Sequence, residues 1–355
     1  MSARIPHALR LATAHELFSH GRTNAVNDPA GLAEALTSAF KWVGGRIALL
    51  LARVFGSRAR GRAGILLYHA ISPASGIPPR RSLNVSPRRF REQLEGLIDA
   101  GYRFWPLRDV LAYASNGNRL PRRVAVITFD DGFANVYLHA FPVLKDLGVP
   151  ATVFLATAYV GNSEPFPFDH WARRHRGTVP DDAWRPLSWT EIREMEASGL
   201  VEFGTHTHSH ASFKRRPDDL FRDLRRSVSV LNRRLGSSDR AFSFPFGSVR
   251  AGFIDAGLLD AARRAGVTCG LSTEIELVDT RTSPFSWGRL EIVDSDTPAI
   301  ARAKLQGWFG WMRGPREVLR RVRRAASSMP WGRGTGPRAG RSTETARTEH
   351  GVGGA

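Results

Sequence analysis

The chain has 355 residues, enough for one catalytic domain of roughly 200–250 residues or for two ordinary domains. Its apolar content of 42% is that of a globular protein. The net charge of +18 lies mostly at the ends, because residues 1–62 carry +6 and residues 313–355 carry +7. The +5 of the remaining residues argues against a nucleic-acid-binding protein, so we expect no nucleic-acid partner.

The only cysteine is Cys269, which excludes an intramolecular disulfide and a cysteine-based zinc site. Any metal must therefore be held by histidine and carboxylate. Residues 1–30 lack the apolar core of a secretory signal. We therefore expect a protein that is cytoplasmic or peripheral to a membrane, and an extracellular location stays open.

Residues 1–62 are expected to form a basic N-terminal extension. Between residues 40 and 55, apolar side chains recur at helical spacing: Phe40, Val43, Ile47, Leu50, Leu51 and Val54. Basic residues flank them: Lys41, Arg46, Arg53, Arg58, Arg60 and Arg62. This pattern suits a helix in the interface of an anionic membrane, with contact through residues 40–62, or a helix packed on the outside of the domain.

The body is expected to span residues 63–313, followed by a basic, disordered tail over residues 314–355. In the first half we expect a strand at 65–68, a helix at 87–101, and strands at 124–129 and 151–155 around a helix at 133–147. A capping box at 188–191 opens the next helix, which is followed by a strand at 201–203 and a helix at 220–235. The last expected elements are a strand at 241–244, a helix at 256–265 and a strand at 267–271. Such alternation predicts an α/β fold with a mostly parallel sheet, closed or nearly closed into a barrel.

Reactive side chains follow four of these strands. His69 follows the first, Asp130 and Asp131 the second, His206 and His210 a later one, and residues 245–247 the strand at 241–244. Because catalytic residues of such barrels lie at the carboxyl ends of the strands, we expect these residues to meet at one rim.

The adjacent carboxylates Asp130 and Asp131 repel each other, and burial makes that costly unless a cation shares them. A metal on one would leave the other free as a base. Followed by Gly132, however, the pair is also a common turn sequence.

Three histidines stand at alternate positions, His206, His208 and His210. In a straight strand, residues four apart are separated by about 13 Å, too far for one ion. In a helical turn they lie about 5–6 Å apart, so a wound segment would let His206 and His210 converge while His208 points elsewhere. Two histidines and one aspartate leave an open position on the metal, which is typical of a hydrolytic rather than a structural site.

Together these motifs resemble the polysaccharide deacetylase family with the NodB homology domain (carbohydrate esterase family 4). The resemblance extends over about residues 65 to 292 and rests on Thr128-Phe129-Asp130-Asp131-Gly132, His206-Thr207-His208-Ser209-His210 and Pro245-Phe246-Gly247. It implies a distorted (β/α)7 barrel, with Asp130 as the base and Asp131, His206 and His210 as ligands of zinc or, in some members, cobalt, manganese or nickel.

The sequence departs from the family pattern at three places. Ser243 stands where many members have an arginine that orients the base, and Arg289 is a candidate to replace it. A late Leu-x-His with the general acid is missing, and His69 in Leu67-Tyr68-His69 resembles the early histidine of circularly permuted members. The backbone N–H of Phe246 would stabilise the oxyanion in place of the usual tyrosine. A surface arginine and a core histidine stay open for Arg289 and His69.

We therefore expect hydrolytic deacetylation of an N-acetylated polysaccharide or oligosaccharide that contains N-acetylglucosamine, with release of acetate. Asp130 would deprotonate the attacking water and His69 would protonate the leaving amine. An O-acetyl esterase and a non-catalytic carbohydrate-binding protein on the same fold are the alternatives. The insertion at residues 161–186 either walls the substrate groove or packs as a surface loop, and its aromatic residues are Phe166, Phe168, Trp171 and Trp184.

Overall fold

The computed structural model describes residues 45, 47–52, 54–73, 83–236 and 239–310. The predicted tail at 314–355 and most of the predicted N-terminal extension lie outside these residues. So do Phe40 and Val43 of the apolar stripe.

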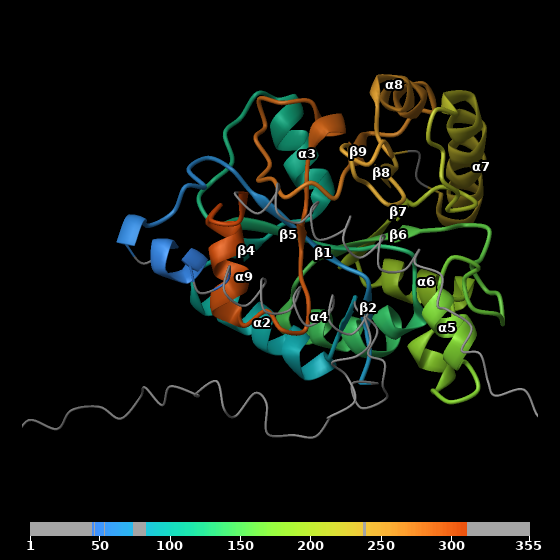
Figure 1. Ribbon diagram of the computed structural model, residues 1–355, viewed down its shortest axis with the longest axis horizontal. Coiled ribbons are helices and arrows are strands. Elements are labelled where there is room, and N and C mark those ends of the chain that lie inside the picture. Colours follow the sequence, from blue (N-terminus) through green and yellow to red (C-terminus); the bar gives the residue numbers. More distant parts are fainter. Residues whose placement is uncertain (1–44, 46, 53, 74–82, 237–238, 311–355) are drawn as a thin grey trace, which may run out of the picture. The chain divides into compact units, whose positions relative to one another are not determined.

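A curled, parallel sheet forms the centre of the described part (Figure 1). Its main strands lie in the order β10 (Leu290–Glu291), β1 (Gly64–Tyr68), β5 (Val124–Phe129), β6 (Ala151–Leu155), β7 (Val201–Thr205), β8 (Ala241–Ser243) and β9 (Cys269–Leu271). The short β4 (Arg103–Phe104) pairs with the start of β5, and β2 (Ala70–Ile71) pairs with β3 (Asn84–Val85) in a separate small sheet. Within the described residues β9 and β10 do not pair, so the sheet stays open there rather than closing into a complete barrel.

Helices cover this sheet. They are α2 (Pro87–Asp99), α3 (Leu107–Ser115), α4 (Phe141–Leu147), α5 (His170–His175), α6 (Trp189–Ala197), α7 (Pro217–Leu235), α8 (Ala256–Arg264) and α9 (Pro298–Leu305). A π-helical turn, η1 (Val136–Ala140), precedes α4, and η2 (Asp181–Ala183) and η3 (Pro284–Ser286) are single 3₁₀ turns. In Figure 1, α7 and α8 lie side by side next to β8 and β9, and α2 lies beside α9.

The strands are buried on both faces, which explains their continuous apolar runs. Alternate residues serve two separate clusters. Leu66 and Ile127 pack in the cluster that includes residues of α2, α4 and α6, whereas Ile65 and Val126 pack with Phe154 and α3. The carboxyl ends of the strands therefore project from a closely packed core.

Most of the predicted elements are found, and β5 and β6 have the predicted bounds. The capping box before α6 is also present, because the Ser188 hydroxyl accepts from the Glu191 N–H at 3.2 Å while the Glu191 carboxylate accepts from the Ser188 N–H at 2.8 Å. The predicted helix at 133–147 begins instead as the π-helical turn η1. Ser86 does not cap α2 with its side chain; its hydroxyl donates to Asp294 at 2.7 Å.

The described residues between 45 and 55 are helical, with one side against the body of the domain. Ala48 is fully buried and Leu51 is partly buried in the main core cluster. Three other residues of the predicted apolar stripe face outward: Ile47, Leu50 and Val54 are 44%, 62% and 64% exposed. Among the helices of the described residues, none combines the length and hydropathy needed to span a bilayer.

Candidate metal and catalytic site

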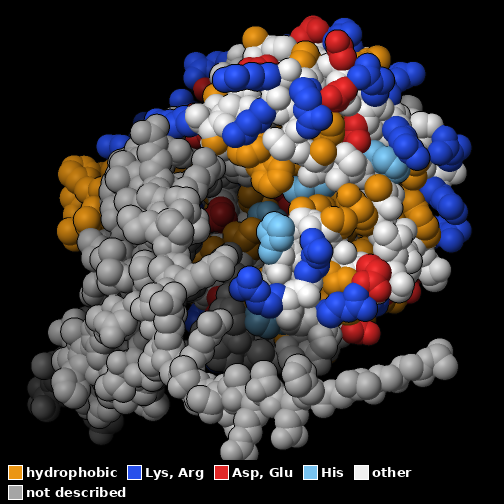
Figure 2. All heavy atoms as spheres, turned by 45° about the vertical axis from the view of Figure 1, so that its right-hand side comes forward, with side chains coloured by type: hydrophobic (Ala, Val, Ile, Leu, Met, Phe, Trp, Pro, Cys, Tyr) orange, Lys and Arg blue, Asp and Glu red, His pale blue; other side chains and the backbone are white. Residues whose placement is uncertain are grey.

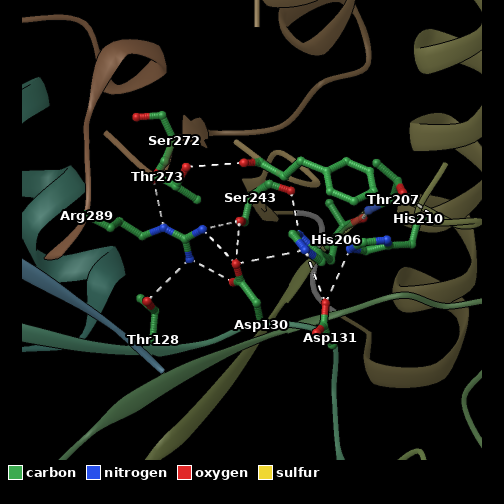
Figure 3. Close-up of polar contacts among 12 residues, drawn as sticks. Thr128, Asp130, Asp131, His206, Thr207, His210, Ser243, Ser272, Thr273 and Arg289 are labelled. Carbon is green, nitrogen blue, oxygen red and sulfur yellow. Dashed lines mark hydrogen bonds and ion pairs between the residues drawn. The ribbon is translucent and has the colours of Figure 1, made fainter. Parts of the chain in front are cut away.

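Because the strands are parallel, their carboxyl ends meet at one rim, and the side chains predicted to act there come together. Figure 3 shows Asp130 between Arg289 and His206, with Asp131 next to His206 and His210. In the space-filling view, histidine and hydrophobic side chains gather around a hollow on this face (Figure 2).

The two aspartates leave the end of β5 through an unusual backbone. Asp131 has φ of 74° and Gly132 has φ of 87°, both in the left-handed region. A Cβ on Gly132 would also lie 2.6 Å from the Leu155 side chain, so glycine is required here by backbone conformation and by space. This turn is what directs two consecutive carboxylates to the same rim.

Asp130 is held by a buried, two-pronged ion pair. The Arg289 Nη1 and Nη2 atoms each donate to one carboxylate oxygen at 2.7 Å, and both residues are at most 2% exposed. Nε of Arg289 donates to the Ser272 carbonyl at 3.1 Å, which fixes the plane of the guanidinium. Arg289 is thus a buried partner of Asp130, and the alternative of a surface arginine is wrong.

The backbone at Gly288, directly before Arg289, passes close to Glu274. A Cβ on Gly288 would lie 2.2 Å from the Glu274 carbonyl oxygen, and the Arg289 N–H donates to that carbonyl at 2.8 Å. Arg289 and Asp130 are 159 positions apart, so spacing alone does not predict their ion pair, and only the family resemblance named Arg289 as the residue that orients the base.

Burial alone would raise the pKa of the Asp130 carboxyl, but the charge of Arg289, with contributions from His206 and His69, leaves it below its ordinary value. For Asp131, burial likewise opposes ionisation, and the hydrogen bond and charge of His210 bring its pKa well below the usual range. Both carboxylates are therefore ionised at neutral pH, as a base and a metal ligand require.

Ser243, at the end of β8, contacts both the Asp130–Arg289 pair and His206. Its hydroxyl lies 2.7 Å from Arg289 Nη2 and 3.3 Å from an Asp130 oxygen, and its carbonyl accepts from His206 Nδ1 at 2.8 Å. The sequence indicated Ser243 only as the place of a missing arginine. In the structure Arg289, directly before β10, binds Asp130 and uses the small side chain of Ser243 as a second partner.

His206 is buried directly after β7. Because its Nδ1 donates to the Ser243 carbonyl, Nε2 carries the free lone pair and faces Asp131 Oδ1 at 3.5 Å. Burial lowers the pKa of His206 to about 4 despite the neighbouring Asp130, so the ring is neutral and able to bind a cation.

His210 reaches the same carboxylate, with Nε2 at 3.3 Å from Asp131 Oδ1. The expected helical turn between the two histidines is wrong. The segment is an irregular loop in which Thr207 and His210 have φ of 69° and 53°. The bend comes from these left-handed residues and is stabilised by the Thr207 hydroxyl, which accepts from the His210 N–H at 3.0 Å.

His208 points away from the cluster, as the predicted convergence of His206 and His210 in a wound segment required. Its Nδ1 lies 3.0 Å from the Thr157 hydroxyl, and its N–H donates to Asp223 at 2.6 Å. Asp223 also accepts from the Ser209 N–H at 3.2 Å. His208 therefore belongs to the support of the loop.

The three converging side chains fit a divalent metal. One donor atom from each of Asp131, His206 and His210 lies within 4.8 Å of the others. Ligand atoms around a tetrahedral ion with bonds of about 2.0–2.1 Å are about 3.3–3.4 Å apart. The two distances from Asp131 to the histidines, 3.5 and 3.3 Å, are close to this separation.

His69 and Phe246 complete the rim. His69 follows β1 and is near enough that its charge contributes to the low pKa values of Asp130 and Asp131. Phe246 has φ of 63° and its ring is 46% exposed. The Thr273 hydroxyl donates to its carbonyl at 3.2 Å, while within the described part of the chain its N–H donates to no protein group.

Two parts of the insertion at residues 161–186 have different surroundings. Trp184 is buried in a small cluster with residues of α5, as a packed surface loop would be. Phe166 is buried and Phe168 stacks on the His210 ring, so this part of the insertion lies against the candidate metal site.

A cavity of about 850 Å³ lies at the opposite ends of the strands, where Thr152, Glu202 and Ala241 line it. None of the predicted site residues borders this cavity. The candidate site is therefore defined by its converging side chains and not by the volume of a pocket.

Comparison with known proteins agrees with this geometry. The family model described as polysaccharide deacetylase matches residues 117–270. The poly-beta-1,6-N-acetyl-D-glucosamine N-deacetylase of Staphylococcus aureus is 27% identical over 223 residues, which are 60% of this chain and 69% of that protein. The protein of the same name from Staphylococcus epidermidis is 27% identical over 217 residues, covering 59% and 68%. Over residues 117–270 the chain thus matches the polysaccharide deacetylase family.

Solved structures extend the comparison to the fold. IcaB from Ammonifex degensii is 25% identical, with a TM-score of 0.55 over 69% of this chain and 97% of that one. The Streptococcus pyogenes deacetylase PplD, 24% identical, superposes with a TM-score of 0.57 over 69% and 98%. The predicted NodB-like (β/α)7 fold and the predicted class of enzyme, a hydrolase of acetyl groups on polysaccharides, are thereby confirmed.

Proposed function

We propose that this protein is a metal-dependent N-deacetylase that releases acetate from a glycan containing N-acetylglucosamine, and that poly-β-1,6-N-acetylglucosamine is the first substrate to test. One observation carries the proposal. An open set of three metal ligands lies beside a separate, ionised carboxylate, Asp130, at the carboxyl ends of the strands. The names of the staphylococcal relatives supply the candidate glycan.

Asp131, His206 and His210 would hold the ion, and zinc is the proposed metal because two imidazoles and a carboxylate suit it. When bound, such an ion lowers the pKa of a water molecule and polarises the acetyl carbonyl. Cobalt, manganese or nickel could also support activity in this ligand set.

The side chains of this chain would carry the proton transfers. Asp130 takes a proton from the water that attacks the acetyl carbon, and Arg289 keeps the carboxylate ionised and correctly oriented. The Phe246 N–H donates to the carbonyl oxygen as negative charge develops on it. His69 then gives a proton to the amine nitrogen as the C–N bond breaks, so that acetate and a free amine result.

Acetate release would test this proposal directly. The purified protein, loaded with zinc, should release acetate from poly-β-1,6-N-acetylglucosamine or another oligosaccharide in a panel of N-acetylated and O-acetylated glycans. Activity confined to O-acetylated glycans would show an esterase instead. Glycan binding without acetate release from any member of the panel would identify the non-catalytic alternative.

We further propose that the protein associates with anionic membrane surfaces through residues 40–62. The helical segment at 47–55 supports this, because four of the eight large exposed hydrophobic residues of the described chain lie on it: Ile47, Leu50, Val54 and Phe55. The surrounding charge is complementary to anionic lipid, since residues 35–91 contain no aspartate or glutamate. Arg58 lies beside this surface, with its guanidinium 4.1 Å from the Trp308 ring.

Point substitutions test membrane association better than removal of residues 1–62, because Ala48 and Leu51 pack in the core. Leu50→Glu and Val54→Glu should each reduce sedimentation with anionic liposomes and leave acetate release from soluble substrate unchanged. Leu138→Glu, at an exposed position on η1, is the matched control and should sediment like the wild type. Equal sedimentation of all variants would show that this face does not contact the membrane.

A further inference from the structure

The two candidate metal-binding histidines are supported in different ways. Nδ1 of His206 donates to the Ser243 carbonyl at 2.8 Å. Nδ1 of His210 is buried and has no hydrogen-bond partner among the described residues. Histidines that bind metals usually donate their second nitrogen to a carboxylate or carbonyl, which fixes the ring orientation. Some other contact must therefore orient the ring of His210.

That contact is the face of Phe168. The rings of Phe168 and His210 stack with centroids 3.7 Å apart and planes inclined by 22°. Phe246 also touches His210, but by its edge, at 5.1 Å and 66°. His206 meets the same ring at 4.8 Å and 58°. Among the described residues in ring contact with His210, Phe168 alone is nearly parallel to the imidazole, so its face opposes tilting of that ring.

Phe168 is itself held on several sides. Its ring stacks on Phe166 at 5.0 Å, and Phe166 is 1% exposed. Tyr159 meets the edge of Phe168 at 5.9 Å, and the Tyr159 hydroxyl donates to the Ser209 carbonyl at 2.9 Å, next to His210. The aromatic group is thus joined to the same loop that carries His210, so the two rings keep their relative position.

We propose that Phe168 is a positioning residue for the metal site, holding the His210 imidazole by ring stacking where His206 is held by a hydrogen bond. The inference rests on the metal site proposed above. An immobilised ring loses little freedom when Nε2 binds a cation, whereas a ring with neither stacking nor a hydrogen bond must be ordered by the metal itself. Removal of outer partners of metal-bound histidines typically lowers metal affinity about 10–100-fold, and we expect the lower part of that range for Phe168→Ala.

Metal affinity is the measurement to make. The apoprotein should be titrated with zinc in competition with a chromophoric chelator, for the wild type and for Phe168→Ala, Phe168→Leu and Phe168→Tyr. Alanine and leucine should both weaken binding, because leucine restores apolar volume but not the flat ring. Tyrosine should restore wild-type affinity. Phe246→Ala removes the edge contact to the same imidazole and is the matched control, with affinity near that of the wild type.

Two further readings separate a positioning role from misfolding and from failure of the metal site. The thermal unfolding of the apoproteins should show that each variant is folded. The visible spectrum of the cobalt-loaded protein should differ between the wild type and Phe168→Ala, since it reports ligand geometry. A wild type that binds no metal would overturn the metal site itself. Equal zinc affinity and equal cobalt spectra in the wild type and folded Phe168→Ala would overturn only the role of Phe168.

Discussion

The site has two parts: a base side, formed by Asp130, Arg289 and Ser243, and a metal side, formed by Asp131, His206 and His210. Different interactions stabilise the two. On the base side, Asp130 and Arg289 neutralise each other and Ser243 adds a hydrogen bond, so the buried charges are matched within the protein. On the metal side, Asp131 faces two imidazoles, of which His206 is neutral and His210 has an unpaired Nδ1. The base side is a buried ion pair matched within the protein, whereas the metal side is three converging side chains that fit a cation.

This difference separates two consequences of substitution. Substitutions on the metal side should remove a ligand atom but leave the buried Asp130–Arg289 ion pair intact. They should therefore reduce metal affinity more than folding stability. Changes on the base side should break a buried ion pair, so they should reduce folding stability together with activity. The following experiments test that division, in order of expected effect.

The largest effect is expected for the ligands themselves. Asp131→Ala, His206→Ala and His210→Ala should each lose zinc binding by more than the 10–100-fold typical of an outer partner, and acetate release should fall with it. Metal content, measured by elemental analysis after dialysis, checks this. His208→Ala should keep the metal because that ring faces Thr157. Full zinc occupancy in His210→Ala would show that His210 is not a ligand.

The proton-transfer residues come next. Asp130→Asn and His69→Ala should each lower turnover of an N-acetyl sugar by about 10²-fold or more while retaining zinc. An activated ester such as p-nitrophenyl acetate needs no acid to expel its leaving group. His69→Ala should therefore keep much of its activity on the ester, and Asp130→Asn should not.

The two substrates thus divide the roles of acid and base. Loss of both activities to the same degree in His69→Ala, or loss of neither, would contradict the assignment of His69 as the acid. In that case His69 would be a core histidine that supports the end of β1.

Arg289→Met should affect folding and pH dependence together. It leaves Asp130 buried and unpaired, which should lower the free energy of unfolding by about 3–5 kcal/mol in urea denaturation. Arg289 lowers the pKa of Asp130, and without it burial raises that pKa, so the acidic limb of the activity profile should move to higher pH.

A matched ion pair at the surface provides the control. Arg281 also binds an aspartate with two nitrogens, at 2.9 and 2.6 Å from Asp279, but its side chain is 69% exposed. Arg281→Met should change stability far less than Arg289→Met, because solvent screens the exposed pair, and should leave the pH profile in place. An equal loss of stability in both variants would show that burial does not distinguish them.

The sequence predicted the parts of the site that lie next to strand ends, and the family resemblance added Arg289 as a candidate partner of the base. The contacts of Ser243 and Phe168, which depend on long-range packing, were not predicted. Asp130, Asp131, His206 and His210 follow strands whose apolar runs are visible, and parallel strands bring such positions to one rim. The left-handed turn at Thr207 gave no comparable signal, and a helical turn was expected there.

Contacts that join distant segments were the least predictable. The helix α3, the strand β10 and the helix α9 are short, and each forms against a distant segment: α3 packs on residues of β1 and β5, β10 pairs with β1, and α9 packs against α2. The stacking of Phe168 on His210 likewise depends on how the insertion folds back. Sequence reasoning named Phe168 as an aromatic of the insertion but could not decide which group it would meet.

The smallest effect is expected for Ser243→Ala, which removes one hydroxyl and leaves the backbone of both sides intact. The Ser243 hydroxyl lies between Arg289 and Asp130, but these two residues also bind each other directly, so stability should fall by only about 1 kcal/mol. Turnover should fall ~5-fold if the transition state loses the same free energy of stabilisation because Asp130 is less well oriented. Zinc affinity should not change, because His206 is held by the Ser243 carbonyl and not by its side chain. Measured together, zinc affinity and turnover would then separate the two sides of the site at a single residue, and a parallel loss of both would mean that the base side and the metal side are coupled through β8.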